Sequence, residues 1–156
     1  MLGHFGFSYV GLIYLVMLLV PNILWTKYRQ TDGDDITESR VLVLLERIGQ
    51  ASCFCLVLIF SDFNLAPFTP WSLWLIASFL LMVGYEICWV RYFTGEHIAT
   101  TLYRSFLGIP LPLATLPVTA FLLLGVYGRV IWLIVAAVVL GVGHVGVHVQ
   151  HYRALK

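Results

Sequence analysis

Residues 129–153, RVIWLIVAAVVLGVGHVGVHVQHYR, decide the fold class, because they form an apolar stretch long enough to cross a lipid bilayer. The run from Val130 to Gly143 is continuously apolar, and His144 and His148 follow it, still embedded among valines and glycines. Because a helix turns by about 100° per residue, two side chains four positions apart lie on one face. Ionisable groups inside a membrane span are costly to place there, so this face is a candidate functional site.

The composition of the whole chain is that of a membrane protein. Of its 156 residues, 60% are hydrophobic and 11% are charged, and the mean hydropathy is +0.91. A soluble domain of this size needs far more charged surface. The formal net charge is +1, so the chain has no basic face for nucleic acid. The predicted partner is therefore the lipid bilayer, and nucleic acid is excluded.

Five apolar segments follow one another along the chain, separated by short polar stretches. We predict an all-α integral membrane bundle of five transmembrane helices, a single domain over residues 1–156. The predicted spans are residues 5–25, 41–60, 71–92, 109–127 and 130–152. Between the third and fourth spans, GEHIATTLYRSFLG (95–108) is predicted to form a short interfacial helix, because its apolar residues recur at helical spacing. An ordinary loop is the alternative there.

Basic residues set the predicted orientation of the bundle. Seven of the eight Lys and Arg residues outside the span interiors fall on one side of a five-span arrangement: Lys27, Arg29, Arg40, Arg91, Arg104, Arg153 and Lys156. Arg129 falls on the other side. Because cytoplasmic loops of membrane proteins are enriched in basic residues, we predict that the N-terminus lies outside and the C-terminus inside the cell.

Polar residues from several predicted spans fall at a similar depth. Glu46 lies six residues from Arg40, and Glu86 lies five residues from Arg91. At about 1.5 Å of rise per residue, such side chains lie about 7 to 9 Å below the basic residues. We predict a polar pocket open toward the cytoplasmic leaflet. Its predicted ligand-binding residues are Asn22, Glu46, Gln50, Glu86, His144 and His148.

Carboxylates and histidines together are also the donors that divalent metal ions prefer. The candidate metal ligands are Glu86, His144 and His148, and a divalent ion is the candidate cofactor. No HExxH or other motif of fixed spacing accompanies them. The helix stripe of Glu86 also carries Ser78, Met82 and Trp89, which suggests a face packed on protein. In the structural alternative, the carboxylates only hold helices together, by pairing with Arg47.

Three prolines interrupt the fourth predicted span, and each removes one backbone donor. They are Pro110, Pro112 and Pro117. The carbonyls expected to lose their helical partners are those of Phe106, Gly108 and Leu113. In a membrane, such carbonyls need protein, water or a ligand to satisfy them.

Several segments carry a resemblance to a group of known sequences. They are PNILW (21–25), LLERIG (44–49), YEICWVRYF (85–93), LGIPLPLATLPV (107–118) and GHVGVH (143–148). In these segments the chain resembles small five-span bacterial membrane proteins of unknown function. The resemblance covers most of the chain and implies a bacterial cytoplasmic membrane. It implies no activity.

Three functions from different classes are compatible with this pattern. We favour a protein that binds or transports a small amphipathic or cationic ligand in the polar pocket. The first alternative is a metal-dependent membrane enzyme that acts on a lipid at the inner leaflet. The second is a non-catalytic subunit of a homo-oligomer or larger membrane complex, in which the polar layer joins helices.

Overall fold

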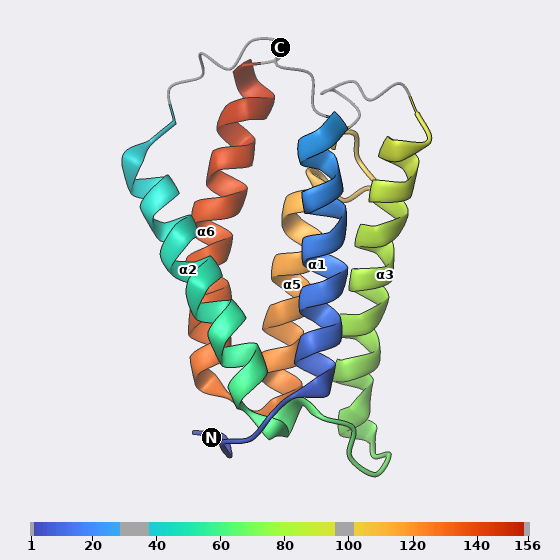
Figure 1. The fold of residues 1–156 in the computed structure, drawn as a ribbon, viewed down its shortest axis with the longest axis vertical. Helices are drawn as coiled ribbons and strands as arrows, with labels where there is room; N and C mark the ends of the chain where they lie inside the picture. The colour runs from blue at the N-terminus through green and yellow to red at the C-terminus, as the bar shows by residue number, and fades with distance from the viewer. Residues whose placement is uncertain (1, 29–37, 96–101, 155–156) are drawn as a thin grey trace.

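The computed structural model describes residues 2–28, 38–95 and 102–154 and shows an all-α protein (Figure 1). The described residues form five α-helices: α1 (Tyr9–Tyr28), α2 (Arg40–Ile59), α3 (Leu73–Phe93), α5 (Pro112–Gly128) and α6 (Ile131–Ala154). Two short 3₁₀ helices, η1 (Ser61–Phe63) and η2 (Pro70–Ser72), lie between α2 and α3. The helices run along the long axis of the molecule, and the two chain ends lie at opposite ends of it (Figure 1).

Four of these helices are long and apolar enough to cross a membrane, and α5 is a shorter apolar helix. The four are α1, α2, α3 together with η2, and α6. At about 1.5 Å of rise per residue, helices of this length match a hydrocarbon core about 30 Å thick. By the length and hydropathy of its helices, the chain is a multi-pass membrane protein. The predicted class, an all-α integral membrane protein, is confirmed in this form.

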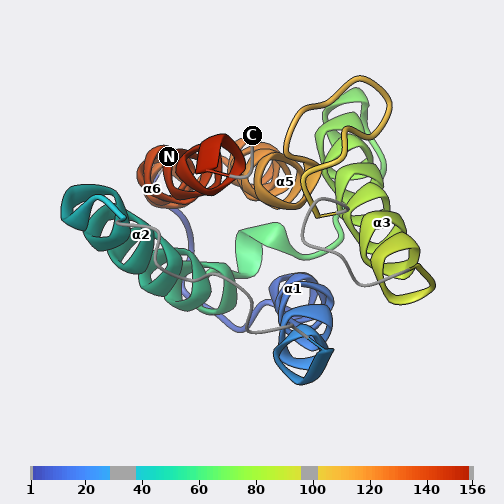
Figure 2. The ribbon, with the colours of Figure 1, turned by 90° about the horizontal axis from the view of Figure 1, so that it is seen from above.

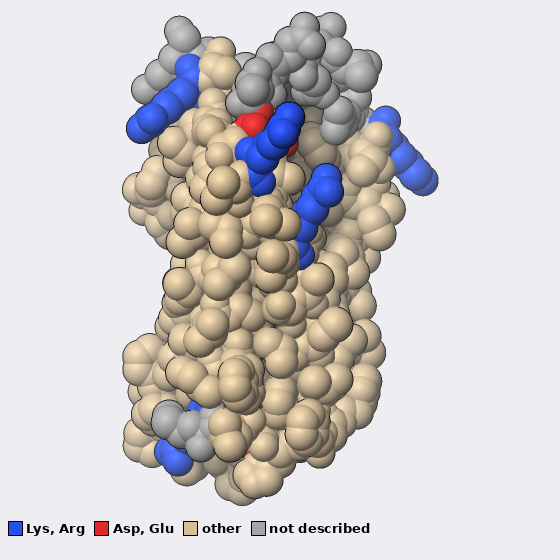
Figure 3. Space-filling model, turned by 90° about the vertical axis from the view of Figure 1, so that its left-hand side faces the viewer, with Lys and Arg blue, Asp and Glu red and all other residues tan. Residues whose placement is uncertain are grey.

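Charged side chains mark the two ends of the bundle. Lys27, Arg91 and Arg153 lie in the last turns of α1, α3 and α6, and Arg40 begins α2. These positions share one end of the molecule, which we call the basic end. Figure 3 shows Lys and Arg gathered there, above a broad band without charge. Arg129, between α5 and α6, lies at the opposite end, which we call the far end.

Glycines bring α2 and α6 into direct backbone contact. A Cβ atom added to Gly49 would lie 2.5 Å from the Cα atom of Leu140, and one added to Gly143 would lie 2.7 Å from that of Glu46. Ordinary contacts of a Cβ atom are 3.4–4 Å, so neither position has room for a side chain. Small residues allow this close approach. The antiparallel pair α2–α6 lies side by side in both views (Figures 1 and 2).

The N-terminal residues pair with the far end of α2 instead of extending α1. The backbone N–H of Gly6 donates to the carbonyl of Ile59 at 2.9 Å, and that of Ser8 donates to Leu58 at 3.0 Å. Because these bonds hold residues 4–8 in an extended path, α1 begins at Tyr9 rather than near residue 5.

A carboxylate fastens this N-terminal segment. The Asp62 side chain lies 2.8 Å from Nδ1 of His4 and accepts the backbone N–H of His4 at 2.5 Å. Partial burial alone would raise the pKa of Asp62. The side-chain and backbone hydrogen bonds from His4 outweigh that effect and hold the pKa below its ordinary value.

Buried hydrogen bonds connect three helices in the far half of the bundle. The Tyr14 hydroxyl on α1 donates to Ser78 Oγ on α3 at 2.9 Å, and Ser78 donates to the carbonyl of Ala120 on α5 at 2.7 Å. All three residues are at most 1% exposed. Around them lie fully buried apolar side chains such as Val57 and Leu124. These bonds therefore join α1, α3 and α5 in this half of the protein.

The segment before α5 differs from its prediction. The predicted interfacial helix over 95–108 falls partly on residues 96–101, outside the described residues. From residue 103 to 111 the backbone forms turns, and Phe106 and Ile109 exchange backbone hydrogen bonds of 3.1 and 2.8 Å. The carbonyl of Phe106 is therefore satisfied by protein, through the backbone N–H of Ile109. The reason is that α5 begins only at Pro112, where a missing N–H costs nothing.

Candidate functional site

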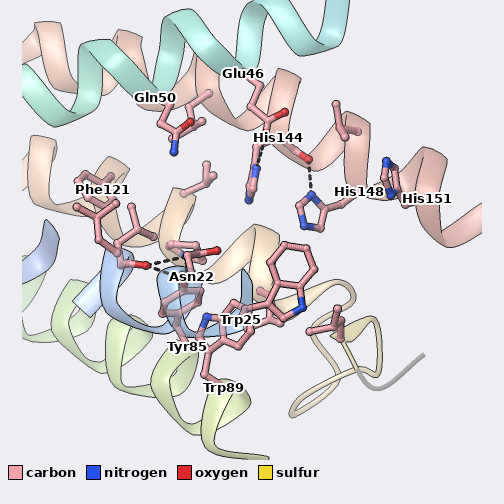
Figure 4. A pocket seen from close by; sticks show the side chains of 18 of the residues that line it. Asn22, Trp25, Glu46, Gln50, Tyr85, Trp89, Phe121, His144, His148 and His151 are labelled. Atoms are coloured by element: carbon pink, nitrogen blue, oxygen red, sulfur yellow. Dashed lines mark hydrogen bonds and ion pairs between the residues drawn. The ribbon is translucent and has the colours of Figure 1, made fainter. Parts of the chain in front are cut away.

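A cavity of about 430 Å³ lies among the helices in the half of the bundle nearer the basic end (Figure 4). All five α-helices contribute to its lining. The polar side chains that matter most are Asn22, Glu46, Gln50, Tyr85, His144 and His148. The structure thus brings together five of the six residues predicted to form the polar pocket, and leaves Glu86 out.

A carboxylate–imidazole pair joins the two helices of the glycine contact. Oε1 of Glu46 on α2 lies 2.5 Å from Nδ1 of His144 on α6. Gly143 precedes His144, and its missing side chain lets the backbone of Glu46 come close enough for this bond. Because the carboxylate engages Nδ1, it orients the ring and leaves Nε2 for other partners. Figure 4 shows the ring directed from Glu46 into the cavity.

His148 lies one helical turn further toward the basic end. Its Nδ1 is 3.0 Å from the backbone carbonyl oxygen of His144. A carbonyl oxygen only accepts hydrogen bonds, so Nδ1 of His148 carries the proton. The two imidazole rings are neighbours, with 4.4 Å between their centroids. The ring of Tyr103 lies on the other side of His148, at 6.1 Å.

Helices α1 and α3 supply an opposite wall that is mainly aromatic. Trp25, Tyr85 and Trp89 line it, with ring centroids 6.5 Å apart for the two tryptophans and 6.2 Å for Tyr85 and Trp89. Asn22 is the amide of this wall. Its Nδ2 group donates to the carbonyl of Leu18 and to the Tyr85 hydroxyl, each at 2.7 Å.

A second carboxylate–imidazole pair stands at the rim of the cavity. Glu38 Oε1 lies 2.7 Å from Nε2 of His151, and both residues belong to the lining. Neither residue was among those predicted to form the pocket. The helical period could have found His151, because it follows His144 by seven residues and returns to nearly the same face of α6. Glu38 precedes the first turn of α2 and has no comparable signal.

Glu86 lies apart from the cavity. The buried stripe of α3 holds Ser78, Met82, Tyr85 and Trp89, so three of its members are those predicted. Its centre, however, is Tyr85, and the next residue along a helix points about 100° away. One carboxylate oxygen of Glu86 is buried without a hydrogen-bond partner among the described residues.

The three predicted metal ligands do not come together. No group of three or more His, Cys, Asp or Glu side chains suited to a metal ion occurs within residues 2–28, 38–95 and 102–154. His144 and His148 are adjacent, but Glu86 is not beside them because α3 turns Tyr85 toward the cavity instead. A bound divalent ion therefore stays a prediction, without the ligand set first assigned to it.

The two walls define what the cavity can do chemically. One wall offers carboxylate and imidazole groups, and the other offers aromatic faces beside an amide. Such a cavity can hold a cation and exchange a proton with it. Comparison of the chain with protein-family models, with curated proteins and with solved structures found no match. The fold and this cavity therefore define the class: a multi-pass helical membrane protein with a bipartite internal cavity.

Proposed function

We propose that the cavity binds a small amphipathic ligand with a cationic group, as a binding or transport protein does. The observation that carries this proposal is the division of the lining between a polar wall on α2 and α6 and an aromatic wall on α1 and α3. Ligand sites are typically concave and mostly apolar, with a few polar groups that orient the ligand, and their volumes are about 300–1,000 Å³.

The polar wall accounts for the charge of the proposed ligand. Glu46 and Glu38 are the two carboxylates of the lining, and each is paired with a histidine. Histidine is the side chain that most readily gives up its charge near neutral pH. A cationic ligand can therefore replace the positive charge of an imidazolium without leaving a buried carboxylate uncompensated.

The aromatic wall accounts for the rest of the ligand. The faces of Trp25 and Trp89 attract cations and cover apolar groups equally well. Apolar side chains such as Phe54 and Phe121 continue the lining toward the far half. A ligand with its cationic group near Glu46 and its apolar part toward Phe121 fits both surfaces.

The charge distribution supports an orientation for the bundle. Lys27, Arg40, Arg91 and Arg153 share the basic end, so the positive-inside rule places this end in the cytoplasm, with the N-terminus outside. The cavity then lies in the cytoplasmic half of the membrane. In the far half, the buried hydrogen bonds of Ser78 join α1, α3 and α5. In a transport cycle, this arrangement corresponds to a state accessible from the cytoplasmic side.

Binding by the purified protein in detergent tests the proposal. The probe is 2-phenylethylammonium chloride, a small amphipathic cation, titrated by calorimetry. Changing Glu46→Gln removes the carboxylate charge, and we expect it to weaken binding about tenfold or more. The matched control is Glu86→Gln, a carboxylate of a membrane helix outside the cavity, which should bind like the parent. Equal affinities of the parent and the Glu46→Gln protein would refute the proposed site.

A further inference from the structure

The hydrogen bonds already made inside the cavity restrict what a ligand must offer. Each polar side chain has a fixed number of donors and acceptors. Where a donor is already used by the protein itself, only acceptors stay free for a ligand. The three best-placed polar residues of the cavity, Asn22, Glu46 and His148, can each be assigned in this way.

His148 presents an acceptor. Its Nδ1 proton is used by the carbonyl of His144. The single carboxylate of Glu46 can balance one positive charge across the two neighbouring rings, and it is bonded to His144. A second buried positive charge would be uncompensated and costly. His148 is therefore the neutral ring, and its Nε2 carries a lone pair rather than a proton.

Glu46 presents acceptors as well. An ionised carboxylate has two oxygens and no donor. Oε1 is bonded to His144 and has a further lone pair. No protein group among the described residues bonds to Oε2. The carboxylate of Glu46, held in place by that one bond, therefore faces the cavity as an acceptor.

Asn22 completes the set from the opposite wall. Both N–H groups of its amide are used, one by the carbonyl of Leu18 and one by the hydroxyl of Tyr85. Because a backbone carbonyl accepts only from a donor, the bond to Leu18 also identifies which amide atom is nitrogen. The carbonyl oxygen of Asn22 is thus the part left for a ligand, and Figure 4 shows it directed into the cavity.

One further group of the lining does not discriminate. The amide of Gln50 can donate or accept, so it suits either kind of ligand. Pro117, which also lines the cavity, has no N–H to offer the carbonyl of Leu113, another lining residue. At Asn22, Glu46 and His148, the groups left for a ligand are therefore acceptors.

We infer that the cavity selects its ligand by N–H donors, so that the ligand's cationic group is a protonated amine rather than a quaternary ammonium. This inference rests on the proposed function and names the chemical class of the ligand. A primary ammonium group carries a positive charge and three donors. These donors match the acceptors of Glu46 and His148 on one wall and of Asn22 on the other. A trimethylammonium group has the same charge and aromatic affinity but no donor, and an anionic group would meet acceptors at these three residues.

The test compares two probes of equal charge. Purified protein in detergent is titrated with 2-phenylethylammonium chloride and with its N,N,N-trimethyl derivative. Because hydrogen bonds to charged groups are the strong ones, we expect the primary ammonium to bind at least about tenfold tighter. The His148→Leu protein should lose most of that preference while keeping its affinity for the trimethyl derivative. A matched control is His4→Leu, at the far end, where the preference should be unchanged.

The outcomes separate this inference from the proposed function. Equal or tighter binding of the trimethyl derivative would overturn the donor selection and leave the cationic site standing. Failure of both probes to bind would overturn both. Zinc chloride is the third probe, since a lone pair on His148 also suits a metal. Binding of Zn²⁺ that depends on His148, without binding of the primary ammonium, would likewise overturn the inference. Loss of binding of both organic probes in His148→Leu would overturn the assignment of donor selection to that residue.

Discussion

Changing Gly143 to alanine should separate α2 from α6 and disconnect the carboxylate–imidazole pair of the cavity. The added Cβ atom would lie 2.7 Å from the Cα atom of Glu46 and 2.7 Å from the carbonyl oxygen of Leu42. Both neighbours are backbone atoms, so neither can rotate away. Ordinary contact begins near 3.4 Å, so the two helices must move apart by about 1 Å. That movement would stretch the bond between Glu46 and His144 from 2.5 Å toward the outer limit of a hydrogen bond.

The size of the effect follows from three contributions. Forcing a methyl group into a packed contact costs about 1–3 kcal/mol. Loss of the bond between Glu46 and His144 adds about 0.5–1.5 kcal/mol. Replacing a helical glycine by alanine gains back up to about 1 kcal/mol. The net loss of about 0.5–4.5 kcal/mol corresponds to a fall in melting temperature of about 1–18 °C for a chain of this size.

Thermal unfolding of the purified protein in detergent measures this change, and Gly84→Ala is the matched control. Gly84 is also a helical glycine, but an added Cβ atom would make ordinary contacts of 3.6 and 3.7 Å with Phe106 and Leu116. That variant should melt at or slightly above the temperature of the parent. If Gly143→Ala melts as high as Gly84→Ala, the glycine contact does not hold α2 and α6 together. Binding of the ammonium probe should also fall in Gly143→Ala and persist in Gly84→Ala.

Three further predictions concern the ends and the core of the bundle. The pKa of Asp62 is lowered in the folded protein, so its contribution to stability is complete above the ordinary aspartate pKa of about 3.9 and is lost as the pH falls through the lower folded value. Melting temperatures measured on descending from about pH 6 should therefore drop more steeply for the parent than for Asp62→Asn. Changing Ser78→Ala should lower stability by about 1–3 kcal/mol, because it leaves the hydroxyl of Tyr14 and the carbonyl of Ala120 without their hydrogen-bond partner. Changing Tyr14→Phe should cost about 0.5–1.5 kcal/mol. Equal melting temperatures of Ser78→Ala and the parent would contradict this. A reporter fused after residue 156 should be active in the cytoplasm, and activity outside the cell would reverse the orientation.

The sequence predicts the helices and the depth of the polar groups better than it predicts which side of a helix faces the cavity. Helix length and hydropathy are properties of a single segment, so the apolar runs could be located one at a time. Glycines beside His144 allow close helix packing, and Gly143 does lie against α2. The partner helix could not be predicted, because any of the other spans would have suited a glycine face.

Glu86 shows the limit of this reasoning most clearly. The sequence places Tyr85 and Glu86 on adjacent positions of one helix, and a polar pocket could use either. A rotation of α3 by one residue would turn Glu86 toward the cavity in place of Tyr85. Hydropathy does not distinguish the two rotations, because both faces of the helix carry apolar residues. The packing of Ser78 against Tyr14 settles the rotation, and it does so through a contact between distant parts of the chain.

The predicted start of α5 was wrong for a different reason. Pro110 and Pro112 were both assigned to a membrane span, since the hydropathy of the segment is continuous. Only the turn formed by Phe106 and Ile109 shows that the helix begins at Pro112. A proline at a helix start and a proline inside a helix look alike in a single sequence, although Pro117 alone interrupts the helix here.

The two walls of the cavity belong to different helices, so a ligand that binds both walls also links those helices to one another. The bond between Glu46 and His144 stays within α2 and α6, whereas the bond between Asn22 and Tyr85 stays within α1 and α3. An ammonium ion bonded to both walls would link these two sets of helices across the cavity. Filling the cavity and fixing the distance between the pairs would then be one event. A covalent link between α1 and α2 beside the cavity would accordingly set how fast the ligand leaves, without touching any group that binds it.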